Sequence, residues 1–592
     1  MTLQQSPSGS PRPRGRRVRA LLAAAALLAL LAAASGAPAA PVFVLTGKGW
    51  GHGIGLGQYG TRGYAQQGWT YDSILARYYQ GTALASGYPN DGVRILLATG
   101  RSSVTVGADA AFELAGETLA AGAYTVTPLA GQVKVTGSGT TRIVASPARF
   151  EPGTAALELG GLPYRGDLLA ASSADGKTIA IVNALARELY LRGVVPREMP
   201  SSWLPEALKA QAVAARSYSF AVGGHCVWLG GGALGEAVGL AASPLAALAL
   251  GQPAAEPVFC ADTRDQVYGG KSAETDATTG AVKATAGRVV TYGGSVATTY
   301  FFSTSGGRTA AKADEWGGAA VPYLVSVSDP YDTISPHHVW GPADAEVDCA
   351  GTARDCVFTA AQVESGLGLA LIPVDLRVTA RNSSGRVALL EATTPAGTTT
   401  FSGTTARTKL ALRSTWFSVG VLSLERSATT VVYGGKVKLS GLARSGGTAG
   451  WDAAHLQRRP YGATAWTTVG EALPRGAWTK TVRPPVRTDY RAVSGNATGA
   501  AARVKVRTRV TFSVPRKPYT RLAGAVGPAR AGISVTLERK RADGTWKLVA
   551  TTSTKADGGF SFTISRLGTY RARADAGGGY VAGGATVTVP PS

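Results

Sequence analysis

A single glutamate lies between two prolines in the segment 196–200, PREMP, ahead of an alanine-rich stretch. We expect the chain to break at Pro196 and at Pro200, because proline restricts the backbone. A carboxylate on such a stiffened turn is held in a fixed direction, and a general acid needs that geometry before it needs a tuned pKa. Glu198 is therefore the candidate catalytic acid. The alternative is an ordinary solvated charge, which is what most glutamates are.

Polar side chains recur in the alanine-rich stretch that comes next. Proline near its start and glycine after its end predict a helix that begins near Pro205 and ends near Gly223. Gln211 and Tyr218 are seven residues apart and so share one helix face. Arg216 is too polar to be buried without a partner. These three are candidates for holding a substrate, although an alanine-rich core helix with incidental polar residues explains the same pattern.

A glycine-rich segment at 48–68, KGWGHGIGLGQYGTRGYAQQG, comes after a predicted strand. His52 lies between two glycines, where backbone can approach a ligand closely, and Gln58 and Tyr59 lie further along it. The segment lacks the Gly-Lys-Ser/Thr ending of a phosphate-binding loop. We interpret it as a sugar-contact loop or a structural loop, and both roles stay open for His52.

A polar turn is predicted at 303–309, STSGGRT. Its hydroxyls and the cation of Arg308 can line a polar cleft, with Ser305 at its centre; an ordinary hairpin is the alternative. His337 and His338 have no acidic pattern close to them in the sequence. We interpret these two histidines as surface residues.

Taken together, these segments resemble the stage II sporulation protein D family (SpoIID/LytB). The resemblance covers about residues 42–420 and is strongest in EMP followed by EALKAQAVAARSYS. Further matching segments are the glycine-histidine-glycine loop, DQVYGG at 265–270, YFFSTSGGRT at 300–309, PYLVSVSDPYD at 322–332 and LRSTWF at 412–417. In the sporulation proteins the glycine-histidine-glycine loop closes the domain, whereas here it opens it. Such a change of order is tolerable if the ends of the domain lie close together.

The resemblance implies a lytic transglycosylase that cleaves the MurNAc–GlcNAc bond of peptidoglycan to 1,6-anhydro-MurNAc ends. Glu198 would be the single acid and base, with a pKa raised by apolar neighbours such as Met199 and Trp203. No cofactor is implied. The candidates for holding the glycan strand are His52, Gln58, Tyr59, Gln211, Arg216, Tyr218, Ser305 and Arg308.

A non-catalytic role is the alternative, because some relatives are described as enhancers of a separate amidase. On that interpretation the domain binds cell-wall glycan or a partner amidase, and Glu198 only contacts sugar. An assay for anhydro-sugar products separates the two hypotheses.

The chain pattern predicts an α+β fold: a SpoIID-like mixed-sheet domain with a catalytic helix region at 40–420, then two all-β immunoglobulin-like sandwich domains at 423–508 and 509–592. Alternating strands are expected over 92–190, and a short helix over 70–81. The two C-terminal units form a repeat of about eighty residues, in which Trp466 corresponds to Trp546. Adhesion to wall polymer and simple spacing are equal alternatives for these units.

Residues 1–39 have a basic start, an uncharged apolar run and an Ala-Pro-Ala site, which predict a secretion signal. In an exported protein four cysteines most simply form two disulfides. Sequence order favours Cys226–Cys260 and Cys349–Cys356. A metal site is the competing interpretation, because His225 adjoins Cys226 and some clostridial relatives carry zinc there. The spacing lacks paired Cys-x-x-Cys ligands, so we predict disulfides and no metal.

The formal net charge of +23 is spread along the whole chain. We predict no nucleic-acid binding, because no segment concentrates Lys and Arg beside aromatic side chains. The expected partners are peptidoglycan glycan strands and anionic wall polymers, with an amidase as the alternative partner, and positive charge would steer the protein to them. The expected location is outside the cell, on the wall.

Overall fold

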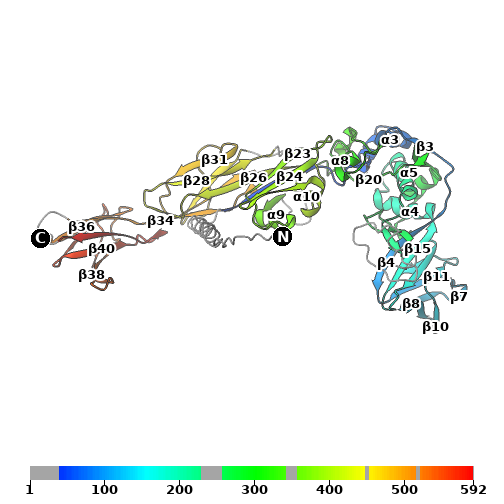
Figure 1. Ribbon diagram of the computed structural model, residues 1–592, viewed down its shortest axis with the longest axis horizontal. Coiled ribbons are helices and arrows are strands. Elements are labelled where there is room, and N and C mark those ends of the chain that lie inside the picture. The colour runs from blue at the N-terminus through cyan, green and yellow to red at the C-terminus, as the bar shows by residue number, and fades with distance from the viewer. Residues whose placement is uncertain are drawn as a thin grey trace, which may run out of the picture.

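The computed structural model describes residues 39–228, 256–341, 356–446, 453–495, 497–514 and 520–590. Three bodies lie in a row (Figure 1). The first holds most of the helices and the candidate site. The second and third are built mainly of strands. Residues 1–38 of the secretion signal predicted at 1–39 lie outside the described residues, as does Cys349.

Two mainly antiparallel sheets lie in the first body. One has the order β16-β17-β4-β15-β14-β11-β6-β7 and the other β10-β9-β8-β5-β12-β13. The first sheet is made of β4 (Gly92–Arg101), β6 (Phe112–Leu114), β7 (Glu117–Leu119), β11 (Ala148–Glu151), β14 (Asp167–Ser172), β15 (Ile179–Ala186), β16 (Cys226–Trp228) and β17 (Glu256–Cys260). The second is made of β5 (Val104–Ala108), β8 (Gly122–Leu129), β9 (Gln132–Gly137), β10 (Thr140–Ala145), β12 (Leu157–Leu159) and β13 (Leu162–Tyr164). The expected strand region at 92–190 is confirmed as far as Ala186, after which the chain is helical. Strand β17 pairs in parallel with β4.

The central strand β15 runs directly into the helix that carries Glu198. Its sequence, IAIVNALA, is buried at most positions because both faces of the strand are covered. Helix α4 (Arg187–Glu198) begins without an intervening loop, and α5 (Pro205–Ala221) begins with Pro205 in its first turn. The predicted end of the second helix before Gly223 is confirmed.

The predicted chain break at Pro196 is wrong, because this proline lies inside the last turn of α4. Proline there removes one hydrogen bond. The turn stays closed because the Met199 N–H donates to the Val195 carbonyl at 2.9 Å. The chain leaves the helix at Met199, and Pro200 comes next, outside the helix.

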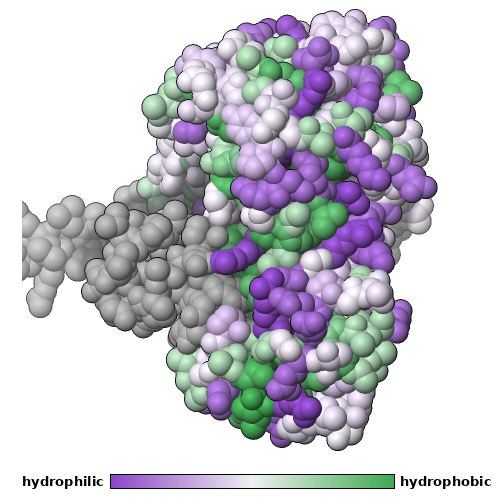
Figure 2. All heavy atoms as spheres, turned by 90° about the vertical axis from the view of Figure 1, so that its right-hand side faces the viewer, coloured by the Kyte–Doolittle hydropathy of each residue, from purple (hydrophilic) through white to green (hydrophobic). Residues whose placement is uncertain are grey.

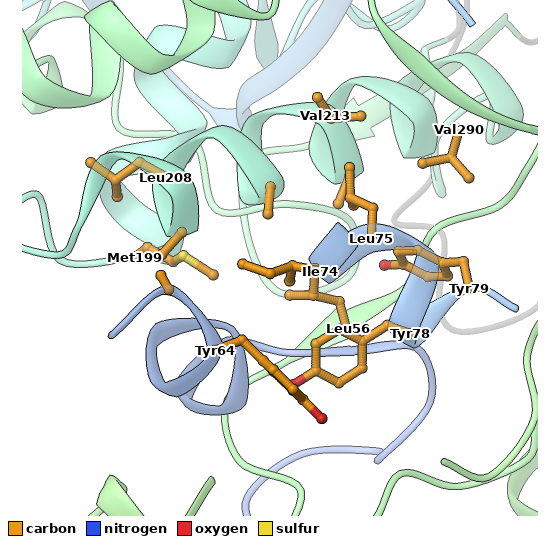
Figure 3. Close-up of a cluster of buried hydrophobic side chains, with 14 of the residues drawn as sticks. Leu56, Tyr64, Ile74, Leu75, Tyr78, Tyr79, Met199, Leu208, Val213 and Val290 are labelled. Atoms are coloured by element: carbon orange, nitrogen blue, oxygen red, sulfur yellow. The ribbon is translucent and has the colours of Figure 1, made fainter. Parts of the chain in front are cut away.

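An apolar core joins the glycine-rich segment to α5 (Figure 3). Helix α2 (Gln58–Gln66) buries Tyr64. The short helix expected over 70–81 is α3 (Tyr71–Tyr78), which buries Ile74, Leu75 and Tyr78. In Figure 3 these side chains lie beneath α5, which contributes Leu208 and Val213 to the same core. Around this core lie α7 (Asp276–Ala284), β2 (Leu56–Gly57), β3 (Ala83–Ala85), β18 (Val289–Tyr292), β19 (Ser295–Val296) and β20 (Phe301–Phe302).

The second body is built on β1 (Ala39–Lys48), which pairs with a strand from much later in the chain, β26 (Phe417–Arg426). The sheet has the order β21-β1-β26-β28-β31, with β21 (Val339–Trp340), β28 (Val437–Arg444) and β31 (Gly476–Val482), and β22 (Val357–Thr359) also pairs with β1. Successive β1 side chains enter different cores: Phe43 packs with α9 (Ala360–Leu367) and α10 (Gly403–Lys409), whereas Val44 packs with Leu439. The remaining hairpin strands are β23 (Asp375–Arg381), β24 (Val387–Thr394) and β25 (Gly397–Ser402).

The predicted junction at 420–423 falls inside β26, which pairs with β1 on one side and β28 on the other. The sheet is therefore continuous across those residues. Beyond it the first repeat contains β27 (Thr430–Val432), β29 (His455–Pro460), β30 (Thr467–Thr468), β32 (Thr488–Ser494), β33 (Ala497–Thr498) and β34 (Ala502–Arg507). The domain boundaries stay predictions.

The third body consists of two sheets around one core, in the orders β35-β36-β39 and β38-β37-β40-β42. Its strands are β35 (Arg509–Ser513), β36 (Arg521–Gly527), β37 (Ser534–Lys540), β38 (Trp546–Ser553), β39 (Gly559–Thr563), β40 (Gly568–Ala574) and β42 (Gly583–Val589). The short strand β41 (Tyr580–Val581) pairs instead with β34 of the first repeat. The repeat seen in the sequence has a structural counterpart. Arg491 lies 4.3 Å over the ring of Trp466, and Arg571 lies 4.3 Å over the ring of Trp546. The immunoglobulin-like assignment stays a prediction.

The face of the first body shown in Figure 2 carries interleaved hydrophilic and hydrophobic residues, with a central apolar patch bordered by hydrophilic ones. Most of the large apolar side chains of the first body are buried in its interior clusters. Within the described ranges, no helix has both the length and the apolar character needed to cross a membrane.

Candidate active site

Glu198 is the last residue of α4, and its side chain is half-buried. Both carboxylate oxygens are held. The Gln58 Nε2 amide donates to Oε2 at 3.2 Å, and the backbone N–H of Val267 donates to Oε1 at 3.0 Å. These donors come from segments far apart in the chain, so the tertiary fold fixes the direction of the carboxyl group.

Burial raises the pKa of Glu198 above its ordinary value of 4.5. The hydrogen bonds from Val267 and Gln58, and the positive charge of Arg197, act in the opposite direction and lower the pKa. Burial is the largest of these effects, so the predicted upward shift is confirmed in direction. Next to it Met199 is fully buried and Trp203 is 9% exposed, which supplies the expected apolar surroundings.

Gln58 reaches Glu198 because α2 begins directly after β2, the short strand in which Leu56 pairs with Phe301. The sequence predicts a loop over this whole segment, and that prediction is wrong for Gln58–Gln66, which is helical although QYGTRGYAQ contains two glycines. One of them, Gly60, is required by close packing: a Cβ there would lie 2.1 Å from the Tyr78 hydroxyl. The changed order of segments therefore does not separate this segment from Glu198.

Tyr59 and Trp203 form an aromatic pair next to the residues that hold the acid. Their ring centroids are 5.0 Å apart in an edge arrangement, and Arg62 lies 5.4 Å from the Trp203 ring. Tyr59 is the neighbour of Gln58 in the chain and is half-buried. Aromatic side chains beside a few fixed polar groups are typical of ligand sites. Tyr59 and Trp203 thus lie beside the candidate acid, and the contact of Tyr59 with substrate stays a prediction.

His52 has a structural environment. Its Nδ1 accepts from the Ile54 N–H at 3.0 Å, so Nε2 carries the proton and donates to the Phe301 carbonyl, also at 3.0 Å. The ring packs against Phe302 and Trp316 at 5.4 and 5.0 Å. Burial lowers the pKa of His52 to about 3, so the imidazole is neutral. Of its two open roles, the geometry supports the structural one.

A buried arginine that the sequence motifs do not single out fixes the 303–309 turn. Arg386 is fully buried, and its Nη2 donates to the carbonyls of Ser305 and Arg308 at 3.0 and 3.2 Å. A Cβ on Gly53 would lie 2.7 Å from this guanidinium, which explains the glycine beside His52. Burial lowers the pKa of Arg386 to about 10. The loop that contains Gly53 and the 303–309 turn therefore both contact the guanidinium of Arg386.

Two buried carboxylates lie beneath the same turn. Asp332 accepts from the N–H groups of Ser305 and Gly306 at 3.0 and 2.9 Å. His338 Nδ1 lies 2.9 Å from Oδ2 of this carboxylate, so the interpretation of His338 as a surface residue is wrong. Asp329 accepts from the Tyr78 hydroxyl at 3.0 Å, and burial raises its pKa to about 7.

Ser305 and Arg308 are thus parts of this braced turn. Ser305 is fully buried, and its Oγ accepts from the Gly307 N–H at 3.1 Å. Arg308 is half-buried, and its Nη1 lies 3.4 Å from the Ser326 hydroxyl. The contacts described for both side chains lie within the turn and its neighbours, so their predicted contact with substrate stays a prediction.

The three candidate binding residues on α5 do not form one binding surface. Arg216 is fully buried, and its guanidinium binds both oxygens of Glu188 at 2.7 and 2.8 Å. Tyr218 is 4% exposed and donates to Asp265 at 3.1 Å. Gln211 is fully buried, and neither of its amide atoms has a hydrogen-bond partner among the described residues. For Arg216 and Tyr218 the geometry supports an internal role.

The predicted disulfide Cys226–Cys260 is confirmed and closes a separation of 34 residues. The neighbouring His225 lies 2.6 Å from Asp265 through Nδ1. Within the described ranges no group of three or more His, Cys, Asp or Glu side chains is arranged to hold a metal ion. The second predicted pair involves Cys349, which lies outside the described residues.

One region of the chain matches a known protein family. Residues 175–292, which include Glu198 and Val267, match the family model for the stage II sporulation protein, SpoIID. The amidase enhancer of Bacillus subtilis strain 168 is 37% identical over 142 residues, 24% of this chain and 15% of that protein. Stage II sporulation protein D of the same strain is 31% identical over 194 residues, 32% of this chain and 48% of that protein.

The chain thus spans less than half of the length of the curated relatives it matches. Among solved structures, a tetra-tandem repeat from the extending region of a large adhesion protein is similar over 37% of this chain and 68% of that chain, at 17% identity and a TM-score of 0.15. The match at 175–292 and the named relatives agree with the motifs around Glu198. Residues 175–292 thus form a SpoIID domain, similar to the region shared with stage II sporulation protein D and the amidase enhancer.

Proposed function

We propose that the protein acts on the cell wall as a lytic transglycosylase, with Glu198 as its single acid and base. The observation that carries the proposal is the state of this carboxyl group: it is half-buried, both oxygens are held, and burial raises its pKa. A raised pKa favours the protonated form of a glutamic acid, which can then donate its proton.

In the first step Glu198 gives its proton to the oxygen of the MurNAc–GlcNAc bond while the bond from that oxygen to C1 breaks. The resulting carboxylate then takes the proton of the MurNAc C6 hydroxyl as the C6 oxygen bonds to C1. The products are a 1,6-anhydro-MurNAc end and a free GlcNAc hydroxyl, and Glu198 is protonated again. No water is consumed.

This cycle needs one carboxylate, whereas glycosidases that use water or a covalent intermediate usually need two. The polar groups that act on Glu198 in the described part of the chain are Val267, Gln58 and Arg197, and none of them is a carboxylate. The attacking hydroxyl belongs to the substrate, so its effective concentration is high. The Gln58 amide would strengthen its bond to Glu198 when the carboxylate forms, since hydrogen bonds to ionised groups are the stronger ones.

The test is to incubate the purified protein with glycan strands in water enriched in ¹⁸O and to analyse the new ends by mass spectrometry. A lytic transglycosylase gives anhydro ends without the label. A hydrolase would give labelled reducing ends, and that result would overturn the proposed reaction.

A second candidate function is that of a non-catalytic enhancer of a wall amidase. It is favoured by the 37% identity to a protein named amidase enhancer. On this alternative no new glycan ends form, and the protein raises the rate of a purified wall amidase in a way that survives Glu198→Gln. In either function we place the protein outside the cytoplasm, on the basis of the export signal predicted at 1–39.

A further inference from the structure

The third body contains a pocket of about 550 Å³ at one edge of the β37–β38–β40 sheet. This volume lies within the range of small-ligand sites. Five of its lining side chains are cations, and no Asp or Glu is among the lining residues described: the cations are Arg539, Lys540, Arg541, Lys547 and Arg566. The pocket shares no residue with the candidate active site, so a role for it does not depend on the function proposed for Glu198.

The cations converge on one place. Arg539 lies opposite Lys547 on β38 and opposite Tyr570 on β40. Arg539 and Arg566 both act to lower the pKa of the Tyr570 hydroxyl, which burial raises, so both charges lie close to the same phenol. Like charges held together this way repel one another, and an anionic ligand would relieve that repulsion.

The nearby acidic groups are already engaged. Glu538 forms an ion pair with Arg571 at 2.6 Å, and Asp543 accepts from the N–H and the hydroxyl of Thr545. The Nε atom of Arg539 is buried and has no hydrogen-bond partner in the described part of the chain. An internal carboxylate therefore does not bond to this Nε atom.

The first repeat provides an internal comparison. Arg458 occupies the place of Arg539, since it lies opposite Thr467 and Tyr490 in the same register. Three of the cations are absent there: Pro460 stands for Arg541, Thr467 for Lys547 and Val486 for Arg566. In addition, the residue before Tyr490 is Asp489, which binds Arg503 and Arg459 at 2.7 and 3.6 Å. The excess of cations is thus specific to the second repeat and is not required by the shared fold.

The rest of the lining indicates the kind of anion. Leu548 and Val549 are 57% and 47% exposed, and the hydroxyls of Thr563 and Ser565 lie at the same edge. Single-stranded nucleic acids are usually held by exposed aromatic side chains on which bases stack. The aromatic residue in this lining, Tyr570, is only 1% exposed. Hydroxyls, aliphatic surface and guanidinium groups suit a carbohydrate that carries oxyanions.

We propose that this pocket binds the phosphate or carboxylate groups of an anionic carbohydrate polymer, and so gives the second repeat an anchoring role that the first repeat lacks. The test uses the full chain and measures its binding to immobilised phosphomannan, polygalacturonate, neutral mannan and a single-stranded oligonucleotide at low salt. Binding to one or both anionic polysaccharides supports the proposal and identifies the oxyanion. Binding to neither overturns it.

The pocket variant replaces two cations by their counterparts in the first repeat, Lys547→Thr with Arg566→Val. Both side chains are exposed, so the fold should persist; circular dichroism checks this, and the single variant Arg541→Gln gives an independent measurement. The matched control is Lys436→Thr with Arg475→Val, which removes two exposed charges from the first repeat.

We expect affinity for the anionic polymer to fall at least tenfold in the pocket variant, at least threefold in Arg541→Gln and less than twofold in the control. Equal losses in the pocket variant and the control would overturn the proposal. An oligonucleotide that binds as tightly as the polysaccharide and loses as much affinity in the pocket variant would overturn it too.

Discussion

The side-chain amide of Gln58 lies 3.2 Å from Oε2 of Glu198, although 140 residues separate them. One residue belongs to the glycine-rich segment and the other to the end of α4. Only the Glu198 side of this contact lies within the region that matches the SpoIID model. The acid is therefore positioned by a part of the chain outside that region.

Replacement of Gln58 by alanine should remove a positioning contact and leave the acid in place. We expect kcat for anhydro-sugar release to fall about 10- to 100-fold, in the range typical of a lost positioning or charge-assisted hydrogen bond. The bond lowers the pKa of Glu198, so its loss should move the alkaline limb of the pH–rate profile to higher pH. Gln66→Ala, an exposed glutamine on the same helix, is the control and should change neither quantity. An unmoved alkaline limb in Gln58→Ala would contradict the assigned contact.

Gly60→Ala should displace α2 from its packed position. The new Cβ would lie 2.1 Å from the Tyr78 hydroxyl and 2.3 Å from both Asp329 oxygens. Overpacking of this kind costs about 1–3 kcal/mol of folding free energy or more, and Gln58 should move with the helix, so activity should fall too. The measurement is the denaturant midpoint together with anhydro-sugar release.

Gly280→Ala is the matched control, since that position lies in α7 with open space around the new methyl group. Alanine there should stabilise the helix by up to about 1 kcal/mol. A Gly60→Ala protein as stable and active as the wild type would contradict the packing described for α2.

Arg216 should prove to be a stability residue, although the sequence made it a candidate for substrate binding. Its ion pair with Glu188 is almost wholly buried on the arginine side. Arg216→Met would leave Glu188 without its partner, which typically costs about 3–5 kcal/mol. Adding Glu188→Gln should recover part of the loss, as a double-mutant cycle in urea would show. A variant of unchanged stability with a raised KM would instead restore the binding role.

Asp329 should make stability fall as the pH rises. Its folded-state pKa of about 7 exceeds its ordinary value of 3.8, so the folded protein keeps a proton that the unfolded chain loses between these values. The stability linked to that proton is fully present below about pH 4 and is lost as the pH rises through about 7. Asp329→Asn still accepts from Tyr78 but cannot titrate, so it should flatten this part of the curve. The exposed control Asp109→Asn should keep the wild-type slope when unfolding is followed from about pH 4 to 8.

Short-range sequence signals predicted the helices around the acid well. Pro205 at the start of α5 and the apolar face of α3 depend on short-range rules that a sequence displays directly. Helix α2 could not be predicted because its glycines argue against a helix, and only packing against Tyr78 and Asp329 explains Gly60. The helix break expected at Pro196 does not occur, because this proline removes only one hydrogen bond and the last turn of α4 forms without it.

The partners within the site could not be predicted, because they are tertiary. No sequence signal predicts that Arg386 contacts Ser305, which is 81 residues away. None predicts that the Asp332 carboxylate accepts from two backbone N–H groups of the 303–309 turn. Arginine and aspartate are normally exposed, so their burial is the least expected outcome for each residue alone. The interpretation that no acidic pattern lies near His338 is wrong, because the acidic pair in SDPYD lies close before it in the sequence and is the one signal for this contact.

The most direct test of the proposed reaction is the release of anhydro-MurNAc ends from glycan strands by the wild type, by Glu198→Gln and by the matched Glu113→Gln, an exposed glutamate on β6. The amide keeps the shape of the side chain but cannot serve as the acid. We predict full release by the wild type and by Glu113→Gln, and a loss of about a thousandfold or more in Glu198→Gln with glycan binding retained. Release by Glu198→Gln at the wild-type rate would contradict the claim that this carboxyl group performs the reaction.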